Sequence, residues 1–278
     1  FECKKDKITT HLEKIIIYNI ILFSIYQTNY LSIFEMDAKI EPKKTSSGSL
    51  SNIPPQIVQV TSQVAKEAQE LLIIMIQNGC VNDGESCDEE KNIKVLEDYF
   101  QAKGIQTQRY ELEVGGGRPN LLASFGSGDS PRILLGPSHV DVVPADREDG
   151  WVHGPFSGEE VVDEETGETE IWGRGAIDML QTVSIQAAVF ADFYANEDFR
   201  RKLEEGAGTL MFGAVADEEA GGKYGAQYVV KNCWEDWRAD YTIGEIGGAV
   251  LPNTTKYLMA VGEKAPLGVQ IVCEGRQG

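Results

Sequence analysis

Residues 209–222 read TLMFGAVADEEAGG, and this stretch decides the fold class of the chain. The run Thr209–Ala216 is short and almost wholly apolar, which is typical of a strand buried inside a sheet. A long helix is predicted before it over Asp178–Tyr194, and another after it over Gly222–Asn232. This alternation favours an α/β layered domain over a β-sandwich or a helix bundle.

The rest of the chain continues the alternation. Apolar residues at helical spacing predict helices over 57–77 and 89–103. A hairpin is predicted over 158–172, around the turn residues Thr166 and Gly167. The remaining strands are expected at 105–113, 120–125, 132–135, 240–244, 256–261 and 269–274.

The composition is that of an ordinary globular protein. The chain has 278 residues, 42% hydrophobic and 25% charged, which excludes a disordered chain, a collagen-like repeat and a coiled coil. Acidic residues outnumber basic ones by 44 to 25, and a net charge of −19 repels phosphate backbones, so no nucleic-acid partner is expected. Five cysteines without a CxxC pair do not indicate a disulfide framework.

The N-terminal residues differ from the rest. Residues 1–35 contain no Gly, Ala, Pro, Val or Arg, and we expect an upstream or leader segment before a natural start at Met36. The alternative is a membrane anchor or export signal, because lysines precede the apolar run Ile15–Tyr26. That run of about 12 residues is short for a span of about 20, so we expect a cytoplasmic protein without a membrane partner. Residues 36–56 are predicted to be a flexible leader.

A histidine and an aspartate follow the strand predicted at 132–135. His139 and Asp141 are two residues apart, and alternate residues of an extended segment point to the same side. Asp141 can therefore lie beside His139, fix its tautomer and leave the other ring nitrogen free for a metal. The alternative is a strand-end pair that binds no ligand.

Acidic residues follow three more elements. Asp178 comes after a glycine-rich turn and begins a predicted helix, so it is either a ligand or an acid that stabilises the helix start. Asp217, Glu218 and Glu219 leave a buried strand together, where a divalent cation would offset their repulsion, unless the turn is simply solvated. Glu245 follows the strand at 240–244 and is either a ligand or a loop acid. Imidazole and carboxylate ligands together suit Zn, Co or Mn, and a shared acid suits a two-metal hydrolase.

These motifs resemble the zinc metallopeptidase family that includes acetylornithine deacetylase, succinyl-diaminopimelate desuccinylase, aminoacylase and the glutamate carboxypeptidases. The resemblance implies a three-layer αβα catalytic domain with a central mixed sheet over 57–262, followed at 263–278 by the first strand of an α+β lid and dimerisation domain. The matching stretches are Ser138-His139-Val140-Asp141-Val142-Val143-Pro144, Gly150-Trp151 with Pro155-Phe156, Trp172 through Met179, Ala216 through Gly222, and Gly244-Glu245.

The resemblance also implies roles for single residues. It implies two divalent ions, zinc with Co or Mn as alternatives, held by His139 on the first, Asp178 between both, Glu219 on the second and Glu245 completing the first. Asp141 would orient His139. Glu218 would be the general base that takes a proton from the attacking water and returns it to the leaving amine.

The chain departs from the family's pattern in three places. The family's lid histidine and its last metal-ligand histidine have no counterpart, since neither His11 nor His153 fits, and Leu180 stands where the family often has Lys. We therefore expect a C-terminally truncated fragment, inactive or nearly so alone, whose full-length parent hydrolyses small N-acyl amino acids or short peptides as a homodimer. A non-catalytic metal-binding or regulatory protein and a one-metal hydrolase are the alternatives.

Overall fold

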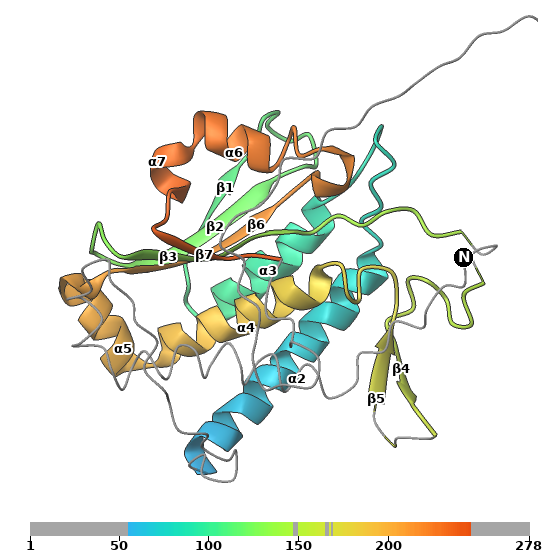
Figure 1. Cartoon of the computed structure of the whole chain (residues 1–278), viewed down its shortest axis with the longest axis horizontal. Helices are drawn as coiled ribbons and strands as arrows, with labels where there is room; N and C mark the ends of the chain where they lie inside the picture. The colour runs from blue at the N-terminus through green and yellow to red at the C-terminus, as the bar shows by residue number, and fades with distance from the viewer. Residues whose placement is uncertain (1–54, 147–149, 165–166, 168, 246–278) are drawn as a thin grey trace, which may run out of the picture. The chain divides into compact units, whose positions relative to one another are not determined.

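A computed structural model describes residues 55–146, 150–164, 167 and 169–245 of the chain (Figure 1). The expected upstream segment, most of the flexible leader, the strands at 256–261 and 269–274 and the expected start of a lid lie outside the described residues. The leader is predicted to extend to residue 56, but helix α2 (Pro55–Asn78) already begins at Pro55. Within the described ranges, no helix combines the length and the hydropathy that a bilayer span requires.

The centre of the domain is a mixed five-stranded sheet, which confirms the α/β prediction. Its strands lie in the order β1-β2-β6-β3-β7. Strand β2 pairs antiparallel with β1 and β6, whereas β3 pairs parallel with β6 and β7. The bounds are β1 (Thr107–Tyr110), β2 (Asn120–Gly126), β3 (Arg132–His139), β6 (Thr209–Val215) and β7 (Tyr241–Ile243).

Helices cover both faces of this sheet (Figure 1). On one face lie α2, α3 (Glu90–Ala102) and α4 (Leu180–Ala195), and on the other α6 (Ala226–Asn232) and α7 (Trp234–Trp237). Helix α5 (Glu197–Lys202) and the turn Leu203–Ala207 connect α4 to β6. These layers match the three-layer αβα domain that the family resemblance implies.

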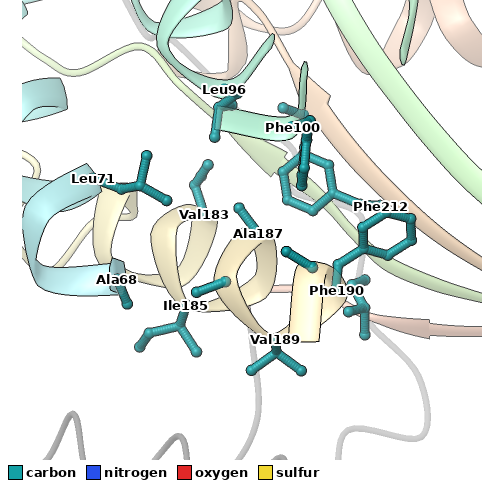
Figure 2. Close-up of a cluster of buried hydrophobic side chains, with 14 of the residues drawn as sticks. Ala68, Leu71, Leu96, Phe100, Val183, Ile185, Ala187, Val189, Phe190 and Phe212 are labelled. Carbon is teal, nitrogen blue, oxygen red and sulfur yellow. The ribbon is translucent and has the colours of Figure 1, made fainter. Parts of the chain in front are cut away.

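The larger core fills the space between the sheet and the first helix layer. Figure 2 shows α4 with apolar residues on several sides, Val183 and Ala187 among them. A helix that is apolar on several sides must be covered by other elements on each of those sides. Helix α4 is covered in this way, because it packs against both α2 and the sheet. The rings of Phe100 and Phe212 meet edge to face with centroids 5.1 Å apart, and Phe190 lies 5.6 Å from Phe100.

A second, smaller core lies under α6 and α7. Trp237 packs there against Tyr110 with ring centroids 5.7 Å apart, and Met211 lies in the same cluster. The predicted hairpin is also present, as a separate two-stranded sheet of β4 (Glu159–Val162) and β5 (Thr169–Trp172). Two clusters of buried apolar residues therefore fix the sheet from both sides, while its strand ends stay available for polar residues.

Candidate metal centre

All of the predicted site residues except Asp178 follow strands whose carboxyl ends share one edge of the sheet. Strands β3, β6 and β7 run parallel, so their carboxyl ends meet at the same edge. His139 is the last residue of β3, the acids Asp217–Glu219 come shortly after β6, and Glu245 lies two residues beyond β7. Parallel pairing thus brings together residues that are about a hundred positions apart in the sequence.

A β-bulge in β3 sets the direction of the histidine. Between Leu135 and Ser138 the pairing of β3 with β6 shifts by one residue. Gly136 occupies the bulge at a φ of 120°, and a Cβ there would lie 2.3 Å from a carbonyl oxygen of β6. Because the extra residue reverses the alternation of side chains, Leu135 and Val140 both belong to the larger core, and His139 faces the other way.

The imidazole of His139 is the point where the carboxylates converge. Its Nε2 lies 3.1 Å from Asp178 Oδ1 and 3.8 Å from Glu218 Oε2. Ligand-type atoms of His139, Asp178 and Glu245 lie within 4.8 Å of one another. The same holds for His139, Glu218 and Glu219. Two overlapping groups of metal-ligand atoms therefore share one histidine.

Asp141 lies behind this cluster and ties it together. Its carboxylate accepts hydrogen bonds from the backbone N–H groups of Glu218 (3.2 Å) and Glu219 (3.1 Å) and from Asn82 Nδ2 (2.8 Å). Nδ1 of His139 lies 3.4 Å from this carboxylate and 2.9 Å from the backbone carbonyl oxygen of Asp141. With Nδ1 as the donor, Nε2 faces Asp178, where it can donate a hydrogen bond while the ring is protonated or bind a metal ion while the ring is neutral.

The pKa shifts in the cluster follow from burial and from crowded charge. Burial lowers the pKa of His139, but the hydrogen bond and charge of Asp141 outweigh it and raise that pKa to about 9. Burial acts to raise the pKa of Asp141, yet its hydrogen bonds hold that pKa below the usual range. Burial also raises the pKa of Glu219 and of Glu245, and the charge of Asp178 raises both further.

The donor set fits a divalent cation. One imidazole nitrogen and several carboxylate oxygens are ligands that Zn²⁺, Co²⁺ and Mn²⁺ accept. Burial and the nearby charges of Asp178 and Glu218 penalise the ionised forms of Glu219 and Glu245, and a bound cation would offset that penalty.

Asp178 is not part of a helix, which corrects one prediction. Helix α4 begins at Leu180 rather than at Asp178, and Met179 precedes it without a side-chain cap. The carboxylate of Asp178 is 63% exposed and points to His139 instead of to the helix start. The reading of Asp178 as a helix-stabilising acid is therefore wrong.

The structure separates the three consecutive acids after β6. Glu218 and Glu219 approach His139, whereas Asp217 turns away and accepts a hydrogen bond from Arg118 Nη2 at 2.8 Å. Arg118 also binds Glu89, which is fully buried. The sequence does not single out Glu89 or Arg118, because only contacts between distant segments bury them.

Comparisons with known proteins find one peptidase family and several enzymes that are similar to this chain. Residues 137–262 match the model of Peptidase family M20/M25/M40. Succinyl-diaminopimelate desuccinylase of Paracoccus denitrificans (strain Pd 1222) is 30% identical over 197 residues, which cover 69% of this chain and 46% of that protein. The enzyme of the same name from Methylorubrum extorquens is 28% identical over 165 residues, which cover 57% of this chain and 38% of the relative.

Solved structures show the same fold. The di-peptidase Dug1p from Saccharomyces cerevisiae superposes with a TM-score of 0.50 at 22% identity, over 68% of this chain and 40% of the dipeptidase. The chain spans less than half the length of the curated relatives given above.

Proposed function

We propose that this chain, whose residues 137–262 match the model of peptidase family M20/M25/M40, forms the metal site of a hydrolase of amide bonds. One observation carries the proposal most directly. His139, Asp178 and Glu245 come from three separate segments and bring ligand atoms within 4.8 Å of one another. A structural ion pair needs only one carboxylate beside an imidazole. It does not require ligand-type atoms from three separate segments around the same ring.

The cluster supports a site for two zinc ions. His139, Asp178 and Glu245 would hold one ion, and Asp178 with Glu219 the other, with Co or Mn as alternatives. When bound, such ions polarise a carbonyl group and lower the pKa of water. Asp141 fixes the ring of His139 through Nδ1, so that Nε2 stays available.

Glu218 is the proposed general base. Its side chain is 53% exposed, so it can meet both solvent and substrate, and its Oε2 lies 3.8 Å from His139 Nε2. A carboxylate oxygen of Glu218 takes a proton from water as the water oxygen bonds to the amide carbon. The same oxygen then gives the proton to the amine nitrogen as the carbon–nitrogen bond breaks.

Small acylated amino acids or short peptides are the proposed substrates. Desuccinylases and a dipeptidase stand among the similar proteins, and both of those names denote cleavage of an amide bond in a small molecule. We propose that the whole protein acts on this class of small amide substrates. We also propose that it is a homodimer with a cytoplasmic location.

The substitution Glu218→Gln in the whole protein tests this function. We expect hydrolysis of N-succinyl and N-acetyl amino acids or dipeptides to fall by roughly 10²- to 10⁴-fold, because the base is lost. Zinc binding should stay close to that of wild type, since none of the four proposed zinc ligands is changed and Gln keeps the shape of the Glu218 side chain. Glu160→Gln, at an exposed position of β4, is the control and should keep wild-type turnover.

The alternative is a protein that binds metal without hydrolysis. If wild type and Glu218→Gln both bind zinc and are equally inactive on all these substrates, the non-catalytic alternative replaces the proposal.

A further inference from the structure

A buried arginine links the candidate metal centre to helix α3. Arg118 donates from Nε to both carboxylate oxygens of Glu89 at 3.1 Å and from Nη2 to one of them at 2.7 Å. The same Nη2 donates to Asp217 Oδ1 at 2.8 Å. The side chains of Arg118, Glu89 and Asp217 are only 12%, 0% and 4% exposed. One guanidinium therefore neutralises two buried carboxylates.

Arg118 and Glu89 together hold Asp217 in an unusual backbone conformation. Its φ is 65°, in the left-handed region that costs a residue other than glycine roughly 1–2 kcal/mol. Its backbone N–H donates to Glu89 Oε1 at 3.1 Å, and its Oδ2 accepts from the N–H of Tyr224 at 3.1 Å. Asp217 is thus fixed through both its backbone and its side chain.

The left-handed residue determines where the next two residues lie. Directly after Asp217, the N–H groups of Glu218 and Glu219 reach the carboxylate of Asp141 at 3.2 and 3.1 Å. Asn82 Nδ2 closes the network, since it lies 2.8 Å from Asp141 Oδ2 and 3.2 Å from Asp217 Oδ1. The turn is therefore anchored on the side of His139 by Asp141 and on the opposite side by Arg118.

We propose that Arg118 is a positioning residue, which fixes the left-handed turn at Asp217 and so aims Glu218 and Glu219 at His139. The inference rests on the proposed function in that it treats this turn as part of a metal site. Arg118 itself touches neither His139 nor the carboxylates around it in the contacts of the described residues. The planar guanidinium of Arg118 donates several hydrogen bonds to the carboxylate of Glu89 and another to Asp217. The single ammonium group of a lysine cannot reproduce this geometry.

The chain offers a matched control in Arg109. Arg109 also binds two carboxylates of helix α3, Glu90 at 2.7 and 2.9 Å and Glu97 at 2.6 Å, and it lies 3.8 Å from a third carboxylate, that of Glu111. Among the contacts of the described residues, this cluster joins α3 to β1 and does not include the turn at Asp217. Substitutions of Arg109 therefore remove a comparable arginine cluster without touching the site.

The experiment compares Arg118→Met and Arg118→Lys with Arg109→Met and Arg109→Lys. Amide hydrogen exchange of Glu218 and Glu219 is measured in zinc-free protein, the affinity for Zn²⁺ by titration, and global stability by urea unfolding. Both Arg118 variants should speed exchange at Glu218 and Glu219 by roughly tenfold or more, after correction for global stability. Zinc affinity should fall by roughly 10- to 100-fold, as is usual for groups that orient metal ligands.

Exchange and zinc affinity that change no more in the Arg118 variants than in the Arg109 variants would overturn the proposal. If Arg118→Met does not fold, Arg118→Lys decides. Unfolding of both Arg118 variants where both Arg109 variants fold would assign Arg118 to folding instead, and would also overturn it. A wild type that binds no zinc would refute the proposed function alone, because the exchange comparison uses zinc-free protein.

Discussion

The core beside α4 and the pair of His139 and Asp141 at the carboxyl edge of the sheet are both buried, but different forces hold them. In the core, Phe100, Phe190 and Phe212 are fully buried and carry no polar atom. At the edge, His139 and Asp141 are equally buried, at 2% and 0% exposure, and every contact described for them is polar. The core is stabilised by removal of apolar surface from water, whereas the edge must offset the desolvation of charges.

The apolar core and the polar edge therefore contribute differently to the free energy of unfolding. Burial of a large apolar side chain contributes about 1.5–3 kcal/mol to folding. A buried ion pair contributes little on balance, because desolvation cancels most of the attraction between the charges. We therefore expect core substitutions to change the free energy of unfolding alone. Edge substitutions that leave a buried charge without its partner should lower stability as well, but they should also change ligand binding.

The largest expected effect on stability is at Phe100. Phe100→Ala should lower the free energy of unfolding by about 3–5 kcal/mol, because it leaves a cavity between α3, α4 and β6. Urea unfolding measures this loss, and Lys94→Ala, at an exposed position of α3, should stay within about 0.5 kcal/mol of wild type. A loss below about 1 kcal/mol for Phe100→Ala would contradict the packing described for this core.

A smaller effect, of a different kind, is expected at Asp141. Asp141→Asn should weaken Zn²⁺ binding by roughly 10- to 100-fold, because the residue that orients His139 loses its charge. It should also lower the pKa of His139, since Asp141 is what raises that pKa. Calorimetric titration and NMR of the imidazole measure the two effects. Unchanged values for both would show that Asp141 does not orient the histidine.

The smallest expected effect is on the pH dependence of folding stability, at Asp192 in helix α4. Burial and the nearby charge of Glu67 raise the pKa of Asp192 to about 6, above its unfolded value of about 4. The folded state therefore binds the proton more tightly, and this stabilisation is full below about pH 4 and lost as pH rises through about 6.

Asp192→Asn should remove this dependence. At pH 7 it should raise the free energy of unfolding by about 1 kcal/mol, after allowance for solvent screening. Asp198→Asn, at an exposed position of α5, is the control, and its free energy of unfolding should stay within about 0.5 kcal/mol of wild type. If the Asp192 and Asp198 variants behave alike between pH 4 and 7, the raised pKa is refuted.

The sequence predicts the layers well because local patterns encode them. Apolar runs and helical spacing identify α3, β2 and β6 to within one or two residues. Helix α6 is shorter than predicted and starts at Ala226 instead of Gly222, because Gly225 passes so close to Ala216 that a Cβ there would lie 1.7 Å from its carbonyl oxygen. Such a close approach depends on tertiary packing, which no local pattern reveals.

The candidate site divides in the same way. Histidine and acids at strand ends are visible as motifs, and the parallel pairing of β3, β6 and β7 follows from the fold class. The bulge at Gly136 and the pairing of Glu89 with Arg118 are not visible, since they join segments far apart in the sequence. The residues that carry the proposed chemistry are thus easier to predict than the residues that position them.

A zinc titration of three proteins tests the central claim, that strand ends assemble a metal site around His139. Wild type should bind Zn²⁺, and His139→Ala should weaken that binding by about 100-fold or more. His153→Ala is the control, because His153 lies 2.9 Å from Glu159 on the hairpin and packs on Trp172, and it should bind like wild type. Equal zinc binding by wild type and His139→Ala would contradict the account.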